Sequence, residues 1–166
     1  MASRGFSVFS LSNAVRDEAD RLGRDHSRDT LIEIGVQLRA AGGSGALAQK
    51  VLPRLQGRST VDSIRHPGEV AVLRTLPRFI LLGVDAPQEL RFERSLQRGR
   101  TGDGTTLQEF ADKESRENST TESGQQLRAT MLLADVVISN HGTLADLHRT
   151  IQPALEQVGV LIDSEG

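Results

Sequence analysis

Residues 79–103, FILLGVDAPQELRFERSLQRGRTGD, indicate the fold of this chain. The segment opens with an apolar run, residues 79–84, short enough to be a strand buried on both faces. Asp85 follows the run, and Pro87 suits the first position of a helix, because the missing N–H of proline costs nothing there. The segment ends in a basic loop, RGRTGD. A strand, an acid, a helix and an arginine loop suit phosphate binding, and the alternative is an ordinary strand–helix unit with a solvated basic end.

The rest of the chain predicts strands that alternate with helices, which is typical of a parallel α/β sheet in one domain, residues 1–166. Further strands are expected at residues 6–11, 59–64 and 134–139. Helices are expected after Ser12 or Asn13, from Asp29 or Thr30 to Gly42, over about residues 46–55, after Pro87 and after Thr143. Residues 101–124 are polar, so we expect them to be mobile or peripheral.

The composition excludes several classes of protein. The 166 residues include no cysteine, which excludes disulfides, thiolate metal sites and cysteine nucleophiles. The formal net charge of −2 gives no general attraction to nucleic acid or anionic membranes. No apolar run approaches the ~20 residues of a membrane span, and the first residues lack the apolar core of a secretory signal. We expect a cytoplasmic protein without nucleic-acid or membrane partners, whose oligomeric state the sequence leaves open.

Polar residues follow three of the predicted strands. Asp62 and Arg65 follow the second strand, Asp85 the third, and Asn140 with His141 the last. In an open parallel sheet, ligands bind at the carboxyl ends of the strands. An isolated aspartate there is more often a helix cap, but three such ends together favour a site for a phosphate or a nucleotide.

Four segments in order resemble a P-loop nucleotide kinase family that includes dephospho-CoA kinases and deoxynucleoside monophosphate kinases, and that is similar to the N-terminal domain of some deoxycytidylate deaminases. Residues 61–70, VDSIRHPGEV, resemble a signature motif of that family, although Ser63 replaces a glycine. The other segments are residues 83–100, 134–143 and 11–18. The resemblance extends over roughly residues 5–155. It implies a three-layer α/β/α sandwich of the P-loop NTPase type, with a lid at about residues 98–124.

The resemblance also implies a function and a set of site residues. It implies ATP-dependent phosphoryl transfer with Mg²⁺ to a small nucleotide-like acceptor, either a nucleoside monophosphate or dephospho-CoA. The implied catalytic residues are Asp62, Arg98 and Arg100, with Asp62 near the transferred phosphate. The implied acceptor-binding residues are Arg16, Arg39 and Arg65, and the implied nucleotide-binding residues are Arg94, Asn140, His141 and Gly142. The family usually has Asn or Asp in place of His141, and we expect no transition-metal site.

One part of that family's pattern is missing. Its members begin with a strand and a GxxxxGK[ST] loop that holds the phosphates and Mg²⁺. Residues 42–50, GGSGALAQK, are the only glycine-rich candidate, and they fit a helix end and a turn better. In the resembled fold the absent strand lies between the strands at residues 59–64 and 79–84, so these must pair directly or leave backbone groups unpaired. The chain would then be either truncated or a non-catalytic relative.

Three functional hypotheses follow from the sequence. The first is an ATP-dependent kinase of small nucleotide-like acceptors. The second is a catalytically inactive or truncated module of the same fold that binds a nucleotide or regulates a partner. The third is a flavodoxin-like or other doubly wound binding protein.

Overall fold

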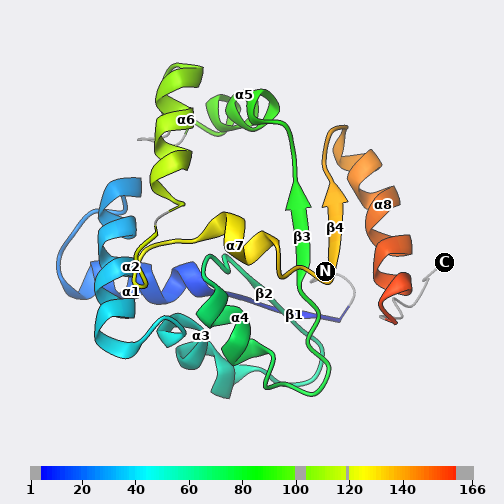
Figure 1. The fold of residues 1–166 in the computed structure, drawn as a ribbon, viewed down its shortest axis with the longest axis horizontal. Helices are drawn as coiled ribbons and strands as arrows, with labels where there is room; N and C mark the ends of the chain where they lie inside the picture. Colours follow the sequence, from blue (N-terminus) through cyan, green and yellow to red (C-terminus); the bar gives the residue numbers. More distant parts are fainter. Residues whose placement is uncertain (1–4, 100–103, 119, 160–166) are drawn as a thin grey trace.

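The computed structural model describes residues 5–99, 104–118 and 120–159, and shows an α/β protein with two pairs of parallel strands (Figure 1). In the first pair, β1 (Ser7–Ser10) lies beside β2 (Ser59–Asp62), with Ser7 opposite Ser59. In the second pair, β3 (Leu82–Asp85) lies beside β4 (Val136–Ser139). No ladder joins the two pairs within the described residues.

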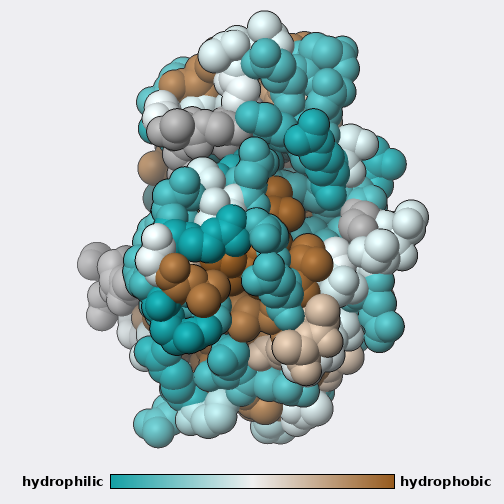
Figure 2. Space-filling view, turned by 90° about the vertical axis from the view of Figure 1, so that its left-hand side faces the viewer, coloured by the Kyte–Doolittle hydropathy of each residue, from teal (hydrophilic) through white to brown (hydrophobic). Residues whose placement is uncertain are grey.

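The first half of the chain places four helices around the first strand pair. They are α1 (Leu11–Arg21), α2 (Arg28–Gly42), α3 (Ala46–Val51), which continues into the 3-10 turn η2 (Leu52–Arg54), and α4 (Pro67–Leu73). Their apolar faces form the main core, which consists of Leu11, Val15, Ala19, Ile34, Leu47, Ala48, Val51 and Leu73. Figure 2 shows apolar side chains among hydrophilic ones on the lower half of one face. Such partial exposure is normal in a small domain.

The second half contributes four helices around the second strand pair. They are α5 (Gln88–Arg98), α6 (Leu107–Arg116), α7 (Leu127–Met131) and α8 (Leu144–Gln157). Both strands point toward α5, and α8 lies along the outer side of β4 (Figure 1). α6 belongs to the segment expected to be mobile or peripheral, but its Phe110 is buried and contacts Phe92 of α5 with 5.7 Å between ring centroids.

The ends of several elements differ from the sequence-based expectation. The strand expected at residues 79–84 begins at Leu82 and continues to Asp85, because it extends only as far as β4 lies beside it. Of the two outcomes expected for the second and third strands, direct pairing is absent, since β2 pairs with β1 alone in the described chain. Residues 42–50 are the end of α2, a turn and most of α3, as the sequence indicated.

The α/β class is therefore confirmed, as an alternation of helices with short parallel strands. Among the residues described, the structure contains no helix with the length and apolar character needed to traverse a lipid bilayer.

Candidate functional site

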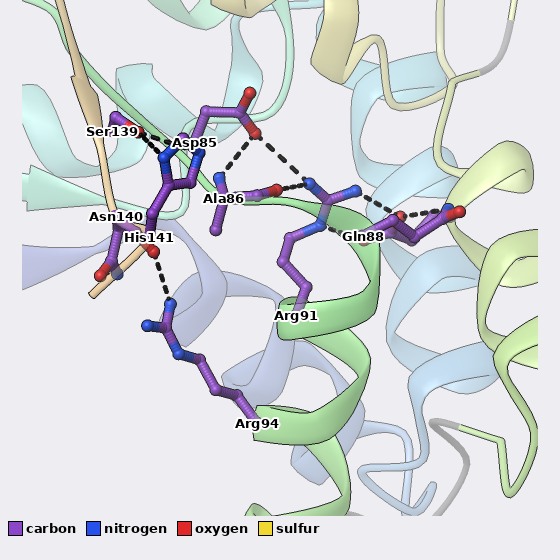
Figure 3. Close-up of polar contacts among 9 residues, drawn as sticks. Asp85, Ala86, Gln88, Arg91, Arg94, Ser139, Asn140 and His141 are labelled. Carbon is purple, nitrogen blue, oxygen red and sulfur yellow. Dashed lines mark hydrogen bonds and ion pairs between the residues drawn. The ribbon is translucent and has the colours of Figure 1, made fainter. Parts of the chain in front are cut away.

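The carboxyl ends of β3 and β4 meet at one place, which Figure 3 shows in close-up. Asp85 lies opposite Ser139 in the parallel pair, and the backbone N–H of Asn140 donates to the Asp85 carbonyl oxygen at 2.6 Å. Two of the three polar strand ends noted in the sequence are thus brought together. We call this group, Asp85, Arg94, Asn140, His141 and Gly142, the β3–β4 end site.

Arg94 joins α5 to the turn that follows β4. Its Nη1 donates to the Asn140 carbonyl oxygen at 3.0 Å, and its Nη2 donates to the Gly142 carbonyl oxygen at 2.7 Å. Figure 3 shows the side chain reaching from the helix toward this turn. Three residues expected to bind a nucleotide, Arg94, Asn140 and Gly142, therefore form one unit. The side-chain amide of Asn140 makes no hydrogen bond within the described part of the chain, so it is available to a ligand.

His141 and the start of α8 complete the turn. The His141 side chain is exposed, and its ring lies against the Ser139 hydroxyl, with 2.7 Å between Nδ1 and Oγ. Thr143 caps α8, as expected from the sequence, by accepting a hydrogen bond from the Asp146 backbone N–H at 3.2 Å. Hydrogen bonds from the Thr143 hydroxyl and backbone lower the pKa of Asp146 to about 2. A carboxylate that stays ionised at the first turn of a helix fixes the turn.

Arg91, on the same helix, serves another purpose, which the sequence analysis missed. Its Nε and Nη2 donate to the two carboxylate oxygens of Glu114 at 2.8 and 2.7 Å, and its Nη1 lies 3.3 Å from Asp85. Burial alone would raise the pKa of Glu114, but hydrogen bonds from Arg91 and Gln88 outweigh it and keep the pKa below its usual value. This two-pronged pair attaches α6 to α5. The spacing of residues along α6 could not have revealed the Arg91–Glu114 pair, because its two members lie 23 residues apart.

Of the two arginines expected to be catalytic, Arg98 and Arg100, the structure describes one. Arg98 is the last residue of α5, is exposed, and has no ion-pair partner among the described residues. It follows Arg94 by four residues, so the two side chains lie on one side of the helix. Arg100 lies outside the described residues.

The carboxyl end of β2 forms a separate group. Asp62 is exposed and accepts a hydrogen bond from the Ser63 hydroxyl at 2.9 Å, and Ser63 has a φ of 62°, in the left-handed region that favours glycine. Arg65 donates to the Gln125 side chain at 3.0 Å and lies 3.4 Å from Glu117. No hydrogen bond or ion pair links Asp62 or Arg65 to the β3–β4 end site within the described chain. Arg65 therefore contacts the end of α6 and the segment before α7, whereas Asp62 contacts its neighbour Ser63.

The two remaining acceptor-binding candidates lie elsewhere. Arg39 is buried, and its Nε and Nη2 donate to Oε1 of the fully buried Glu69 at 3.0 and 2.8 Å. Oε2 of Glu69 accepts from the backbone N–H groups of Arg65 and His66. The Arg39 guanidinium therefore stabilises the interior of the protein. It does not face a site where an acceptor substrate could bind. Arg16 is half-buried and donates to the Ser12 hydroxyl of its own helix at 2.6 Å.

No group of three or more His, Asp or Glu side chains with metal-binding geometry occurs in the part of the chain that the structure describes. The single carboxylates at the strand ends, Asp62 and Asp85, are the described groups that would suit an oxygen-preferring ion such as Mg²⁺.

Comparison with known proteins identifies the relatives of this chain. A UPF0200 protein of Pyrococcus horikoshii is 30% identical over 164 residues, which cover 93% of this chain and 86% of that protein. A UPF0200 protein of Hyperthermus butylicus is 31% identical over 160 residues, covering 94% and 83%. The chain belongs to the UPF0200 family. A UPF0200/UPF0201 protein of Archaeoglobus fulgidus is 28% identical over 169 residues, covering 97% of this chain and 51% of that protein.

Membership of the UPF0200 family corrects the family assignment made from the sequence. The relatives are consistently UPF0200 proteins, and no family model matches the chain, so its assignment to a P-loop nucleotide kinase family was wrong. The names of these relatives describe no activity and no ligand.

Proposed function

We propose that this UPF0200 protein binds a nucleotide, or a similar small molecule with a base-like ring and a phosphate, at the β3–β4 end site. The observation that carries the proposal is the pair of hydrogen bonds from Arg94 to the carbonyl oxygens of Asn140 and Gly142. These bonds fix the turn at the carboxyl ends of two parallel strands, where ligands bind in open α/β sheets.

The available groups suit the two ends of such a ligand. The side-chain amide of Asn140, which has no hydrogen-bond partner among the described residues, offers a donor and an acceptor, which match the edge of a purine or pyrimidine. Arg98, one helical turn beyond Arg94, offers a guanidinium whose planar donors suit a phosphate. The His141 ring extends the polar edge beside Asn140. Base recognition and phosphate recognition would thus come from adjacent elements, the turn after β4 and the end of α5.

Phosphoryl transfer from ATP is a further hypothesis, and it makes larger demands on the chain. It needs ATP and Mg²⁺ near Asp62, together with an acceptor near Arg65, whose guanidinium contacts Gln125 and Glu117. Binding without transfer needs only the β3–β4 end site. We therefore favour a nucleotide-binding or regulatory module and treat ATP-dependent transfer to a nucleoside monophosphate or dephospho-CoA as the alternative.

Two broader features belong to the same proposal. We infer that the two parallel strand pairs belong to one layer with helices on both sides, as in a three-layer α/β/α arrangement. We also place the protein in the cytoplasm, where nucleotides are abundant. Support for the first inference comes from the alternation of helices with parallel strands along the chain.

Isothermal titration with Mg·ATP, and separately with AMP and dCMP, tests the proposal. We expect at least one of these to bind, and we expect Arg98→Ala and Asn140→Ala each to weaken binding about tenfold or more, because each removes a hydrogen-bonding partner worth roughly 1.5 kcal/mol or more. Arg78→Ala, which removes an exposed positive charge outside the site, is the matched control.

The outcomes separate the two functions. Binding that both site variants weaken, with no ATP consumed in a coupled assay, supports a binding module. ATP consumption that depends on Asp62 and on an added monophosphate supports the kinase alternative. Absence of binding heat from a protein whose circular dichroism shows a folded chain contradicts both.

A further inference from the structure

A groove lies beside β1, away from the β3–β4 end site. It has a volume of about 440 Å³, and β1, α1, α3 and the turn η2 form its walls. Most of its lining is polar; Phe9, Ala14 and Val51 are apolar, and Lys50 and Arg54 contribute positive charge. Nothing in the proposed nucleotide site uses these residues.

One side of the groove is an open strand edge. β1 pairs with β2 only, within the described residues, and the Ser7 N–H donates to the Arg58 carbonyl oxygen at 2.9 Å on the β2 side. Because alternate residues of a parallel strand direct their backbone groups to opposite sides, the N–H and C=O of Val8 face away from β2. The Val8 side chain is 53% exposed. An open edge of this kind is a template for another strand.

The charges of the groove are unequal. Arg21 is engaged by Glu18 through two hydrogen bonds of 2.8 and 2.6 Å, and the hydrogen bond from Arg21 lowers the pKa of Glu18. Lys50 and Arg54 have no carboxylate partner within hydrogen-bond distance in the described chain, and the Arg54 guanidinium lies 5.6 Å from the Phe9 ring centroid. Of the two carboxylates that line the groove, Asp17 is the one with no ion-pair partner in the described part of the chain. Three positive and two negative side chains line the groove, so its net charge is +1, and Lys50, on the wall formed by α3 and η2, also acts electrostatically on Glu18.

We propose that this groove binds an extended acidic segment of a partner protein, which adds a third strand to the outer edge of β1. The Val8 backbone would pair with the backbone of the segment, as in other cases of strand addition. Lys50 and Arg54 would contact its carboxylates, while Phe9 and Val51 would pack against its apolar residues. A neutral or basic segment would lack the charge match that selects the partner.

A synthetic peptide tests the proposal directly. The probe is a fluorescein-labelled peptide of alternating valine and glutamate, and the matched control has lysine in place of glutamate. We expect fluorescence anisotropy to show binding of the acidic peptide alone, weakened by added salt because exposed charges are screened. The double variant Lys50→Glu/Arg54→Glu should weaken binding at least tenfold, whereas Arg78→Glu, a charge reversal elsewhere, should change it less than twofold.

A second variant tests the strand edge rather than the charge. Val8→Pro removes the outward-facing N–H, and proline is tolerated on edge strands where the N–H faces solvent. We expect this variant to keep its circular dichroism spectrum and lose peptide binding, and we expect the peptide to slow hydrogen exchange of the Val8 amide in the unsubstituted protein. Equal binding of both peptides, binding of neither, or retained binding by Val8→Pro would overturn the proposal. A peptide-independent dimer in sedimentation, abolished by Val8→Pro, would assign the edge to a second copy of this chain instead.

Discussion

The ion pair between Arg39 and Glu69 makes the largest electrostatic demand of any single contact described above. Their side chains are 3% and 0% exposed, so both charges are removed from water. Such a pair is retained only if every oxygen and N–H finds a partner, and Oε2 of Glu69 meets this condition through the backbone N–H groups at the start of α4. Arg39 therefore connects α2 to the cap of α4.

We predict that Arg39→Ala destabilises the protein strongly. It leaves the Glu69 carboxylate buried without its countercharge, which costs about 3–5 kcal/mol in comparable pairs. Arg24→Ala removes an arginine from an exposed pair with Glu33, and should cost about 1 kcal/mol or less. Urea unfolding of both variants measures the difference. Equal effects of the two substitutions would mean that Arg39 does not stabilise the interior.

Stability should also depend on His66, whose ring is buried at the same junction. Burial lowers the pKa of His66, and the Arg39 guanidinium lowers it further, so the folded chain holds the ring neutral. The unfolded chain, with a pKa near 6.5, takes up a proton more readily. The contribution of His66 to stability is thus complete above pH 6.5 and is lost as the pH falls below it.

The measurement is the urea midpoint from about pH 7.5 to about pH 5.5, which we expect to fall less in His66→Asn than in the unsubstituted protein. Asparagine keeps an acceptor for the Gly68 N–H but does not titrate. His148→Asn, at an exposed position on α8, is the control and should leave the fall unchanged. The same slope in His66→Asn would assign the pH dependence to other groups.

At the scale of elements, the helices followed the sequence more closely than the strands did. Thr143 caps α8 and Gly42 ends α2 as expected, because capping depends on residues within one turn. The strand expected from residue 79 starts at Leu82, because only the neighbouring strand β4 decides where pairing begins. The local sequence therefore shows where a helix is capped, but it does not show where two strands begin to pair.

The contact between α3 and α4 depends on two glycines. A Cβ on Gly45 would lie 2.9 Å from the Gly68 carbonyl oxygen, and a Cβ on Gly68 would lie 2.9 Å from the Ser44 carbonyl carbon. Both obstacles are backbone atoms. We predict that Gly68→Ala forces the two helices apart and costs roughly 1–3 kcal/mol.

Thermal or urea unfolding measures this effect. Ala71→Ser, at an exposed position of α4, is the matched control and should stay within about 0.5 kcal/mol. If Gly68→Ala proved as stable as the control, the conclusion that α3 and α4 need a glycine at this contact would be wrong.

At the scale of the whole molecule, Glu117 connects three segments that are far apart in the sequence. It lies at the end of α6, accepts from Arg28 Nε of α2 at 2.8 Å, and lies 3.4 Å from Arg65, which follows β2. Its side chain is 6% exposed. The polar lid segment expected from the sequence is thus attached to the first half of the molecule.

We predict that Glu117→Ala loosens α6 and costs roughly 1–3 kcal/mol, because Arg28 and Arg65 lose a charged partner. Limited proteolysis with trypsin should cut after Lys113 or Arg116 several times faster in this variant. Asp112→Ala, an exposed substitution on the same helix, should leave the cutting rate close to that of the unsubstituted protein. Unchanged cutting in Glu117→Ala would show that Phe110 and the Arg91–Glu114 pair hold α6 without Glu117.

The candidate site was predictable only in part. The sequence placed Asp85 and Asn140 at strand ends, and the structure brings these two together because their strands are neighbours. It also grouped Asp62 and Arg65 with them, but Arg65 contacts Gln125 and Glu117, and Asp62 contacts only the adjacent Ser63 among the described side chains. The functions of Arg39 and Arg91 depend on Glu69 and Glu114, which are 30 and 23 residues away, so no local pattern could reveal them.

The two separate strand pairs have a consequence for folding. Ser7 pairs with Ser59, and Leu82 pairs with Val136, so each pair closes a loop of about fifty residues, and one loop is complete before the other begins. Folding therefore loses the chain entropy of loop closure twice, once for each strand pair. We expect the two halves to open as separate cooperative units in native-state hydrogen exchange once the contacts of Glu117 that join them are broken. Amides of β2 and of β3 should then report two different opening free energies.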